Sequence, residues 1–253
     1  SLRNSSKHSD VMIMKCNQTQ SIFLRLLVFS SLWFGQQLEA KDQRPNIILI
    51  MADDLGYSDI GCYGGEAQTP NLDKLAANGI KLRSFYNAGR CCPTRASLLT
   101  GNYSHAAGMG NMVSFEDQKV TPGSYQGYLD PNTPTIAEHL RQAGYHTYMT
   151  GKWHVGERPE HWPLKRGFDR YFGLISGASS FFEILQEKRK RYMVLQDQEY
   201  VLPKEGYYAT DAFTDKAIEF IQGQEPQTKP FFLYLAYTAP HFPLHAYEAD
   251  IAK

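Results

Sequence analysis

The sequence has little cysteine and no excess of charge of either sign. Its 253 residues include 4 cysteines and no C-x-x-C pair, which is too few for a disulfide scaffold and the wrong spacing for structural zinc. Lysine and arginine (26) balance aspartate and glutamate (26), so the formal net charge is zero. Because proteins that bind a phosphate backbone usually carry a basic excess, we expect no nucleic-acid partner. The 42% of hydrophobic residues nevertheless suffices for a sizeable folded core.

The N-terminal segment also lacks an uninterrupted apolar run long enough for a stable membrane span, which needs about 20 residues. Residues 1–13 are polar and begin with Ser, and we interpret them as translated sequence upstream of a true start at Met14. Residues 14–40 predict a secretory signal peptide, with an apolar stretch interrupted by Arg25 and a small Ala40 at its end. An N-terminal anchor helix is the alternative. A signal peptide predicts a periplasmic or secreted protein, and therefore an oxidising environment for its cysteines.

From residue 41 to 253, signals for strands and helices alternate, which predicts one α/β domain. Apolar runs predict strands buried on both faces of a parallel sheet at 47–52 and 230–237, and another strand at 145–149. Cap, proline and glycine signals predict helices at 70–78, 93–101, 134–143 (capped by Thr133) and 213–221. Residues 81–88 are weakly strand-like, and 155–205 are interpreted as long loops. We expect a mostly parallel central sheet flanked by helices, with functional residues at the carboxyl ends of its strands.

Polar residues that could act in catalysis or metal binding follow the predicted strands or open a predicted helix. They are Asp53, Asp54, Lys152, His154 and His241 after strands, and Cys91 and Arg95 at the start of the helix. Taken singly, each has a structural explanation, because paired aspartates cap turns, lysine and histidine are often solvated, and a lone cysteine is often a buried apolar residue. Four such places in one α/β chain indicate that these residues line a single rim of the sheet.

Together these residue types suit the hydrolysis of an anionic ester. Adjacent carboxylates offer hard oxygen ligands to Ca²⁺ or, less favourably, Mg²⁺, which would neutralise charge on the ester oxygens. A nucleophile at the start of a helix lies next to unpaired N–H groups and the positive end of the helix dipole, which also lowers the pKa of a thiol. His154 and His241 can exchange protons near neutral pH.

The segment 91–101, CCPTRASLLTG, resembles the C-x-P-x-R…T-G signature of type I sulfatases, a family of the alkaline-phosphatase-like superfamily. The resemblance runs from Pro45 to the end of the chain and is closest to bacterial arylsulfatases. Further similar blocks follow in the expected order: Pro45-Asn46-Ile47, Asp53-Asp54-Leu55-Gly56-Tyr57, Thr69-Pro70-Asn71-Leu72-Asp73, Gly151-Lys152-Trp153-His154, Gly167-Phe168-Asp169-Arg170-Tyr171-Phe172-Gly173 and Ala239-Pro240-His241.

The resemblance implies that a maturation enzyme oxidises Cys91 to formylglycine during export. The hydrate of that aldehyde would supply the attacking hydroxyl, and its return to the aldehyde would release sulfate. This implication explains why an exported protein keeps a cysteine at position 91. Cys92 occupies the variable position of the signature and is expected only to fill space.

The resemblance also implies roles for the other residues. Arg95 would hold the formylglycine, Lys152 would bridge it and the sulfate, and His154 would contact its hydroxyl. His241 would bind the sulfate or the leaving oxygen. Asp53 and Asp54, with the formylglycine oxygen at residue 91, would form part of a calcium site. The substrate would be a small aryl or carbohydrate sulfate ester.

The chain departs from the family pattern at its C-terminal side. The family completes the metal site with an Asp-Asn pair and the sulfate clamp with another lysine, and no Asp-Asn-Gly occurs in this sequence. These groups would lie beyond Lys253, so we expect a C-terminally truncated domain that is inactive or unstable as given. The alternatives are a phosphatase or phosphonate monoester hydrolase of the same superfamily, and a non-catalytic anion-binding fragment.

Overall fold

The computed structural model describes residues 43–114, 120–186, 190–223 and 229–252. The predicted upstream segment 1–13 and the predicted signal peptide 14–40 lie outside these residues, so both stay predictions. Across the described ranges, no helix combines the length and the apolar character that crossing a membrane requires.

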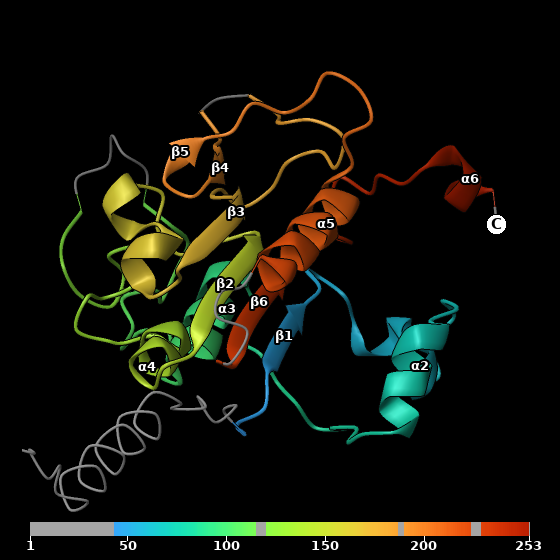
Figure 1. Cartoon of the computed structure of the whole chain (residues 1–253), viewed down its shortest axis with the longest axis horizontal. Coiled ribbons are helices and arrows are strands. Elements are labelled where there is room, and N and C mark those ends of the chain that lie inside the picture. Colours follow the sequence, from blue (N-terminus) through green and yellow to red (C-terminus); the bar gives the residue numbers. More distant parts are fainter. Residues whose placement is uncertain (1–42, 115–119, 187–189, 224–228, 253) are drawn as a thin grey trace, which may run out of the picture. The chain divides into compact units, whose positions relative to one another are not determined.

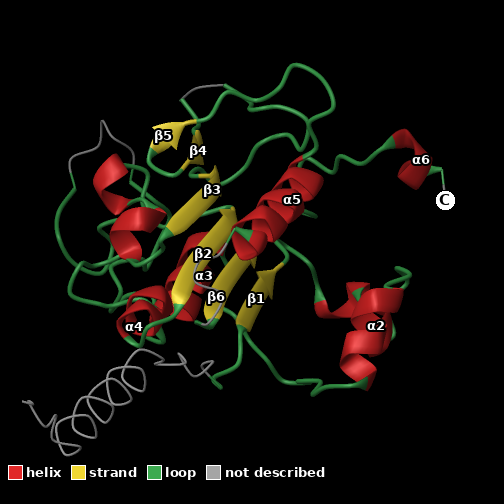
Figure 2. Ribbon diagram, in the orientation of Figure 1, coloured by secondary structure: helices red, strands yellow, loops and turns green. Residues whose placement is uncertain are grey.

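A six-stranded sheet forms the centre of the described domain (Figure 1 and Figure 2). Its strands are β1 (Ile47–Met51), β2 (His146–Gly151), β3 (Arg170–Leu174), β4 (Met193–Leu195), β5 (Gln198–Glu199) and β6 (Phe231–Ala236). They lie in the order β1-β6-β2-β3-β4-β5, and the pairings from β1 to β3 are parallel whereas β4 and β5 add an antiparallel edge. The prediction of a mostly parallel sheet is therefore confirmed.

Helices cover both faces of this sheet. The helices are α2 (Pro70–Ala77), α3 (Cys91–Thr100), α4 (Ile136–Gln142), α5 (Ala209–Gln222) and α6 (Glu248–Ile251), with short 3-10 turns η1 (Tyr57–Asp59), η2 (Gly61–Tyr63), η3 (Pro159–His161) and η4 (Pro163–Arg166). Figure 1 shows α5 in front of the sheet and α3 behind it. Side chains of β6 alternate between the faces: Phe232 and Tyr234 join the core cluster beneath α3, and Leu233 and Leu235 join the cluster beneath α5. β6, an interior strand, is thus buried on both faces, as predicted.

The first strand differs from its prediction. β1 is an edge strand of the described sheet, and only one of its faces packs on the core: Ile47 and Leu49 contact the cluster beneath α3, whereas Ile48 and Ile50 are 53% and 57% exposed. The prediction of burial on both faces is wrong for β1, because an apolar run specifies a strand but not the elements that cover it.

Three helix starts also differ from their predictions, and one of them is that of α5, which begins at Ala209 rather than at 213. α3 begins at Cys91 rather than at Pro93, because proline is tolerated throughout the first turn, where its missing N–H would have no partner within the helix. α4 is capped by Thr135 rather than Thr133, since the Thr135 hydroxyl accepts from the Glu138 N–H and the Glu138 carboxylate accepts from the Thr135 N–H.

Two predicted loop or strand assignments are wrong. Residues 81–88 form no strand, and all of them are exposed. The stretch 155–205, predicted as loops, contains β3, β4, β5, η3 and η4. β3 was hidden because its glycine, Gly173, is a poor strand former; the position needs glycine, since a Cβ there would lie 1.9 Å from the Gly151 carbonyl oxygen of β2.

Candidate active site

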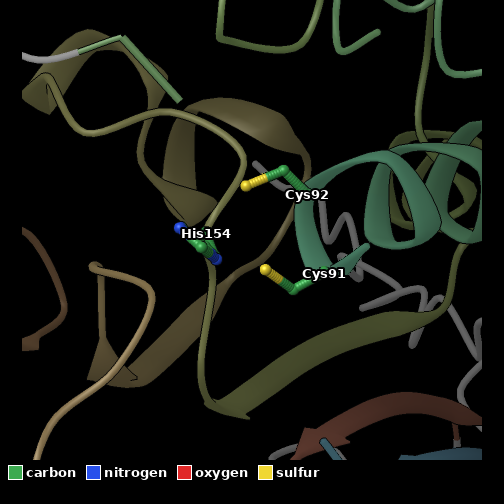
Figure 3. A group of neighbouring side chains, drawn as sticks. All are labelled: Cys91, Cys92 and His154. Atoms are coloured by element: carbon green, nitrogen blue, oxygen red, sulfur yellow. The ribbon is translucent and has the colours of Figure 1, made fainter. Parts of the chain in front are cut away.

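The first turn of α3 presents two thiols to a buried imidazole. Cys91 is the first residue of α3 and is partly buried, and Cys92 follows it with no exposed surface. His154, which is 3% exposed, comes from the segment after β2. Figure 3 shows both sulfur atoms directed toward the His154 ring. One ligand atom from each of the three side chains lies within 4.8 Å of the others.

The surroundings favour negative charge on Cys91. A hydrogen bond from the Cys92 thiol, together with a hydrogen bond to His154 and the positive charge of Lys152, lowers the pKa of Cys91 well below its ordinary value, although burial opposes this shift. The partner thiol behaves oppositely, because its hydrogen bond to Cys91 and its burial raise the pKa of Cys92. Burial also lowers the pKa of His154 to about 4, so the imidazole is neutral at pH 7. The site therefore favours the thiolate form of Cys91, which is the nucleophilic form of a cysteine.

Backbone geometry brings the segment 152–154 into this position. β2 ends at Gly151. The Lys152 N–H then donates to the carbonyl oxygen of Ala236, the last residue of β6, and the His154 N–H donates to that of Ile175, which directly follows β3. Gly151 has φ +103°, and a Cβ there would lie 1.9 Å from the Ala236 carbonyl oxygen. His154 itself has φ +55°, an uncommon conformation for a non-glycine residue. The local fold thus accepts backbone strain at the residue that faces the thiols.

A buried ion network lies beside the thiols. Asp53, 2% exposed at the carboxyl end of β1, has one carboxylate oxygen 3.0 Å from an Arg95 guanidinium nitrogen and the other 2.5 Å from Lys152 Nζ. Arg95 also donates to the Lys152 carbonyl oxygen at 2.8 Å and to the Tyr234 hydroxyl at 3.3 Å. Burial lowers the pKa of Lys152, and the nearby Arg95 charge adds to this effect, whereas Asp53 opposes it. One carboxylate therefore balances two cations that have no exposed surface.

Asp54 and His241 form a second, more exposed pair. His241 Nε2 lies 3.6 Å from an Asp54 carboxylate oxygen, and the Asp54 side chain is 61% exposed. The loops that carry them are tied together, because the Asp53 N–H donates to the Ala239 carbonyl oxygen at 3.0 Å. The carboxyl ends of β1 and β6, neighbours in the sheet, therefore present these residues side by side.

The structure thus brings the predicted residues into three groups. Cys91 and His154 meet directly, Asp53, Arg95 and Lys152 form the ion network, and Asp54 pairs with His241. Within the described residues, the cluster of close ligand atoms contains Cys91, Cys92 and His154 but neither aspartate. Calcium binding by Asp53, Asp54 and residue 91, and the catalytic roles assigned to the other residues, stay predictions.

Three residues of the site were not found from the sequence. Cys92 was interpreted as a space filler, although its adjacency to Cys91 places both sulfurs in one helical turn. Tyr234 was interpreted only as part of a buried strand, yet its hydroxyl accepts from Arg95. Gly177 was not singled out; a Cβ there would lie 2.2 Å from the His154 ring. A glycine shortly after a strand is the only local signal for that close approach.

Comparisons with known proteins show the family to which the chain belongs. The family model described as Sulfatase matches residues 45–253. An arylsulfatase of Klebsiella aerogenes is 38% identical over 212 residues, covering 82% of this chain and 45% of that protein. An N-acetylgalactosamine-6-sulfatase of Mus musculus is 35% identical over 243 residues, covering 91% of this chain and 45% of that protein. The crystal structure of Ps i-CgsB superimposes with a TM-score of 0.72 at 36% identity, covering 83% of this chain and 48% of that one. The chain therefore spans about half the length of these relatives.

Proposed function

Because the chain belongs to the sulfatase family, we propose that it carries the nucleophile side of the active site of a sulfuric ester hydrolase, with residue 91 as the nucleophile. The observation that supports this most is the position of Cys91. It opens α3, lies against neutral His154 and is stabilised as an anion by its neighbours, Lys152 among them. A site that stabilises an anionic nucleophile also suits an anionic ester at the same place.

We further propose that Cys91 is converted to formylglycine by a maturation enzyme before the protein acts. The aldehyde, when hydrated, supplies one hydroxyl to attack sulfur and a second whose deprotonation expels sulfate. Lys152 then provides positive charge to the sulfate oxygens, and His154, neutral at pH 7, can take the proton of a hydroxyl at residue 91. His241, which pairs with the exposed Asp54, would meet the leaving oxygen.

Asp53 and Asp54 supply the hard oxygen donors that Ca²⁺ prefers, so their chemistry fits a calcium ligand set. Asp54 is exposed on the rim, whereas both oxygens of Asp53 contact cationic side chains. A bound Ca²⁺, or less favourably Mg²⁺, would supply positive charge to the ester oxygens. Arg95 and Lys152 contact Asp53 and keep that carboxylate in place.

The proposed substrate is an aryl or carbohydrate sulfate ester. The relatives named for arylsulfatase and N-acetylgalactosamine-6-sulfatase activity support both possibilities. We also propose that the protein is exported to the periplasm or beyond the cell, where a substrate of this kind would reach it. Hydrolysis of phosphate or phosphonate monoesters is the competing activity, because tetrahedral phosphate needs a similar positive clamp.

The test combines mass spectrometry and turnover. The protein is isolated from a host that contains the maturation enzyme, and the tryptic peptide bearing residue 91 is analysed for conversion of the thiol to an aldehyde. The native enzyme is then assayed on matched aryl sulfate and aryl phosphate esters. Conversion at residue 91 with preference for sulfate is expected, and Cys91→Ala should abolish both. An unmodified Cys91 in an active enzyme would refute the proposal, and a preference for phosphate would favour the competing activity. Cys62→Ser, at a partly buried thiol outside the cluster, is the control.

A further inference from the structure

The two thiols and the imidazole at the start of α3 form a cluster of soft metal ligands. The sulfur atoms of Cys91 and Cys92 and a ring nitrogen of His154 lie within 4.8 Å of one another. Cys92 has no exposed surface, and His154 has 3%. Figure 3 shows the three side chains converging from two separate segments of the chain. This convergence is not required by the chemistry proposed above, which uses Cys91 and His154 but assigns nothing to Cys92.

We propose that, while residue 91 carries its thiol, Cys91, Cys92 and His154 bind a thiophilic divalent cation, Zn²⁺ above all. Thiolate and imidazole are the ligands that Zn²⁺ prefers in proteins, and three protein ligands with one open position form a common zinc site. Zn–S bonds of about 2.3 Å and Zn–N bonds of about 2.0 Å place tetrahedral ligand atoms roughly 3.3–3.8 Å apart. The ligand atoms lie within 4.8 Å of one another, so the side chains would move closer together by up to about 1–1.5 Å to reach that range.

A buried polar atom without a partner gives independent support. Within the described residues, His154 Nδ1 is inaccessible to solvent and has no hydrogen-bond partner. A buried unsatisfied nitrogen costs about 1–3 kcal/mol, so a ligand that engages Nδ1 itself would remove that cost. Gly177 packs closely against the ring, because a Cβ there would lie 2.2 Å from His154 Cε1. A ring held in place loses little freedom when it coordinates a metal.

The nearby charges permit a divalent cation. Lys152 and Arg95 contribute two positive charges, but Asp53 contacts both and cancels one of them. Two thiolates then balance the charge of Zn²⁺, and Cys92 releases its proton to the solvent as it binds. Cys91 is only partly buried, which leaves a route for the ion into the cluster and an open coordination position for water.

This site shares residue 91 with the proposed calcium site but differs from it in the other residues and in donor chemistry. It uses soft sulfur and nitrogen donors, whereas Asp53 and Asp54 offer oxygen. The inference does not rest on the proposed function, because it concerns the unmodified thiol. Conversion of Cys91 to an aldehyde would remove one ligand, so zinc binding and maturation would exclude each other at this residue.

The experiment uses the 253-residue chain, produced without a maturation enzyme and shown by mass spectrometry to keep its thiols. Cys16→Ser and Cys62→Ser together leave only the two cluster thiols, and Co²⁺ is titrated as a coloured substitute for Zn²⁺. The expected result is one Co²⁺ per chain with a sulfur-to-cobalt charge-transfer band that Zn²⁺ removes. In this background Cys92→Ser or His154→Gln should weaken binding by at least about tenfold, since even indirect support of a metal ligand is worth 10–100-fold. Far-ultraviolet circular dichroism of each variant confirms that it is folded.

A second measurement avoids substitutions at the cluster altogether. In the otherwise unmutated chain, Zn²⁺ should slow alkylation of Cys91 and Cys92, followed peptide by peptide, and leave the rate at Cys62 unchanged. Equal alkylation rates with and without Zn²⁺, or a cobalt band that persists in folded Cys92→Ser, would overturn the proposal. Protection of all three described cysteines alike would mean nonspecific binding and would also overturn it.

Discussion

Replacing Asp53 by Asn should destabilise the domain strongly. This carboxylate is the shared partner of Arg95 at 3.0 Å and Lys152 at 2.5 Å, and neither cation has any exposed surface. Asp53→Asn preserves the size and shape of the side chain and removes only its charge. The two cations would then lie side by side in the core without their carboxylate partner.

The expected cost follows from that geometry. Breaking a buried ion pair by removing one partner costs about 3–5 kcal/mol, because the remaining charge stays buried and uncompensated. For a chain of this size, each kcal/mol lowers the melting temperature by roughly 2–4 °C, so the loss should be about 6–20 °C. An exposed pair offers the matched control. Lys165 Nζ and Asp197 lie 2.6 Å apart with side chains 52% and 36% exposed, and such surface pairs contribute about 0–1 kcal/mol.

The assay is urea unfolding and thermal melting of the parent chain, Asp53→Asn and Asp197→Asn under identical conditions. Asp53→Asn should lose several kcal/mol, while Asp197→Asn should stay within about 1 kcal/mol of the parent. Equal and small losses for both variants would refute the idea that Asp53 balances two buried cations. A loss at Asp53 that is rescued by also replacing Lys152 with Met would instead support it, since the uncompensated charge would be reduced.

Three further predictions follow from single contacts. Gly177→Ala should displace the His154 ring, which a Cβ would approach to 2.2 Å, and destabilise the chain by about 1–3 kcal/mol in urea unfolding; an unchanged midpoint would contradict this contact. Thr135→Ala should cost about 1 kcal/mol of stability through the lost cap of α4, whereas Thr133→Ala should cost less. A lower melting temperature for Thr133→Ala than for Thr135→Ala would contradict the cap at Thr135 and favour the one at Thr133 that the sequence predicts. Burial lowers the pKa of His161, so the unfolded chain binds more protons than the folded one and stability should fall as the pH drops below 6.5. His161→Gln should reduce that dependence between pH 7 and 5, and identical slopes would contradict the assignment.

Much of the fold could be predicted from the sequence because local signals and tertiary packing agree in its centre. The run 230–237 predicts a buried strand, and β6 lies between β1 and β2 with helices on both faces of the sheet. Local sequence signals do not predict an element whose structure or burial depends on the strands and helices packed against it. β3 forms through pairing with β2 around Gly173, a residue that weakens a strand on its own. Ile48 and Ile50 are apolar in an edge strand, where periodicity alone does not show whether anything covers them.

The site shows the same division. Spacing and residue type identified Asp53, Lys152, His154 and Cys91 as polar residues at strand ends and at a helix start, and the structure brings them close together. The pairings among them were not predictable in the same way. Lys152 was assigned to the substrate from the family resemblance, whereas in this structure its ammonium contacts Asp53. Such pairings depend on distances across the sheet between segments 99 residues apart.

Backbone conformation at two residues explains why these pairings escape sequence reasoning. Gly151, at φ +103°, turns the chain at the end of β2, and His154, at φ +55°, directs its imidazole to the start of α3. A histidine after a strand commonly points to solvent, and only the positive φ together with the space above Gly177 places this one against two thiols. Once the ring is there, Cys92 is no longer a filler, because its thiol hydrogen bond to Cys91 and the His154 ring act on the same sulfur. The chemistry at residue 91 therefore depends as much on glycines that carry no functional group as on the titratable residues of the motif.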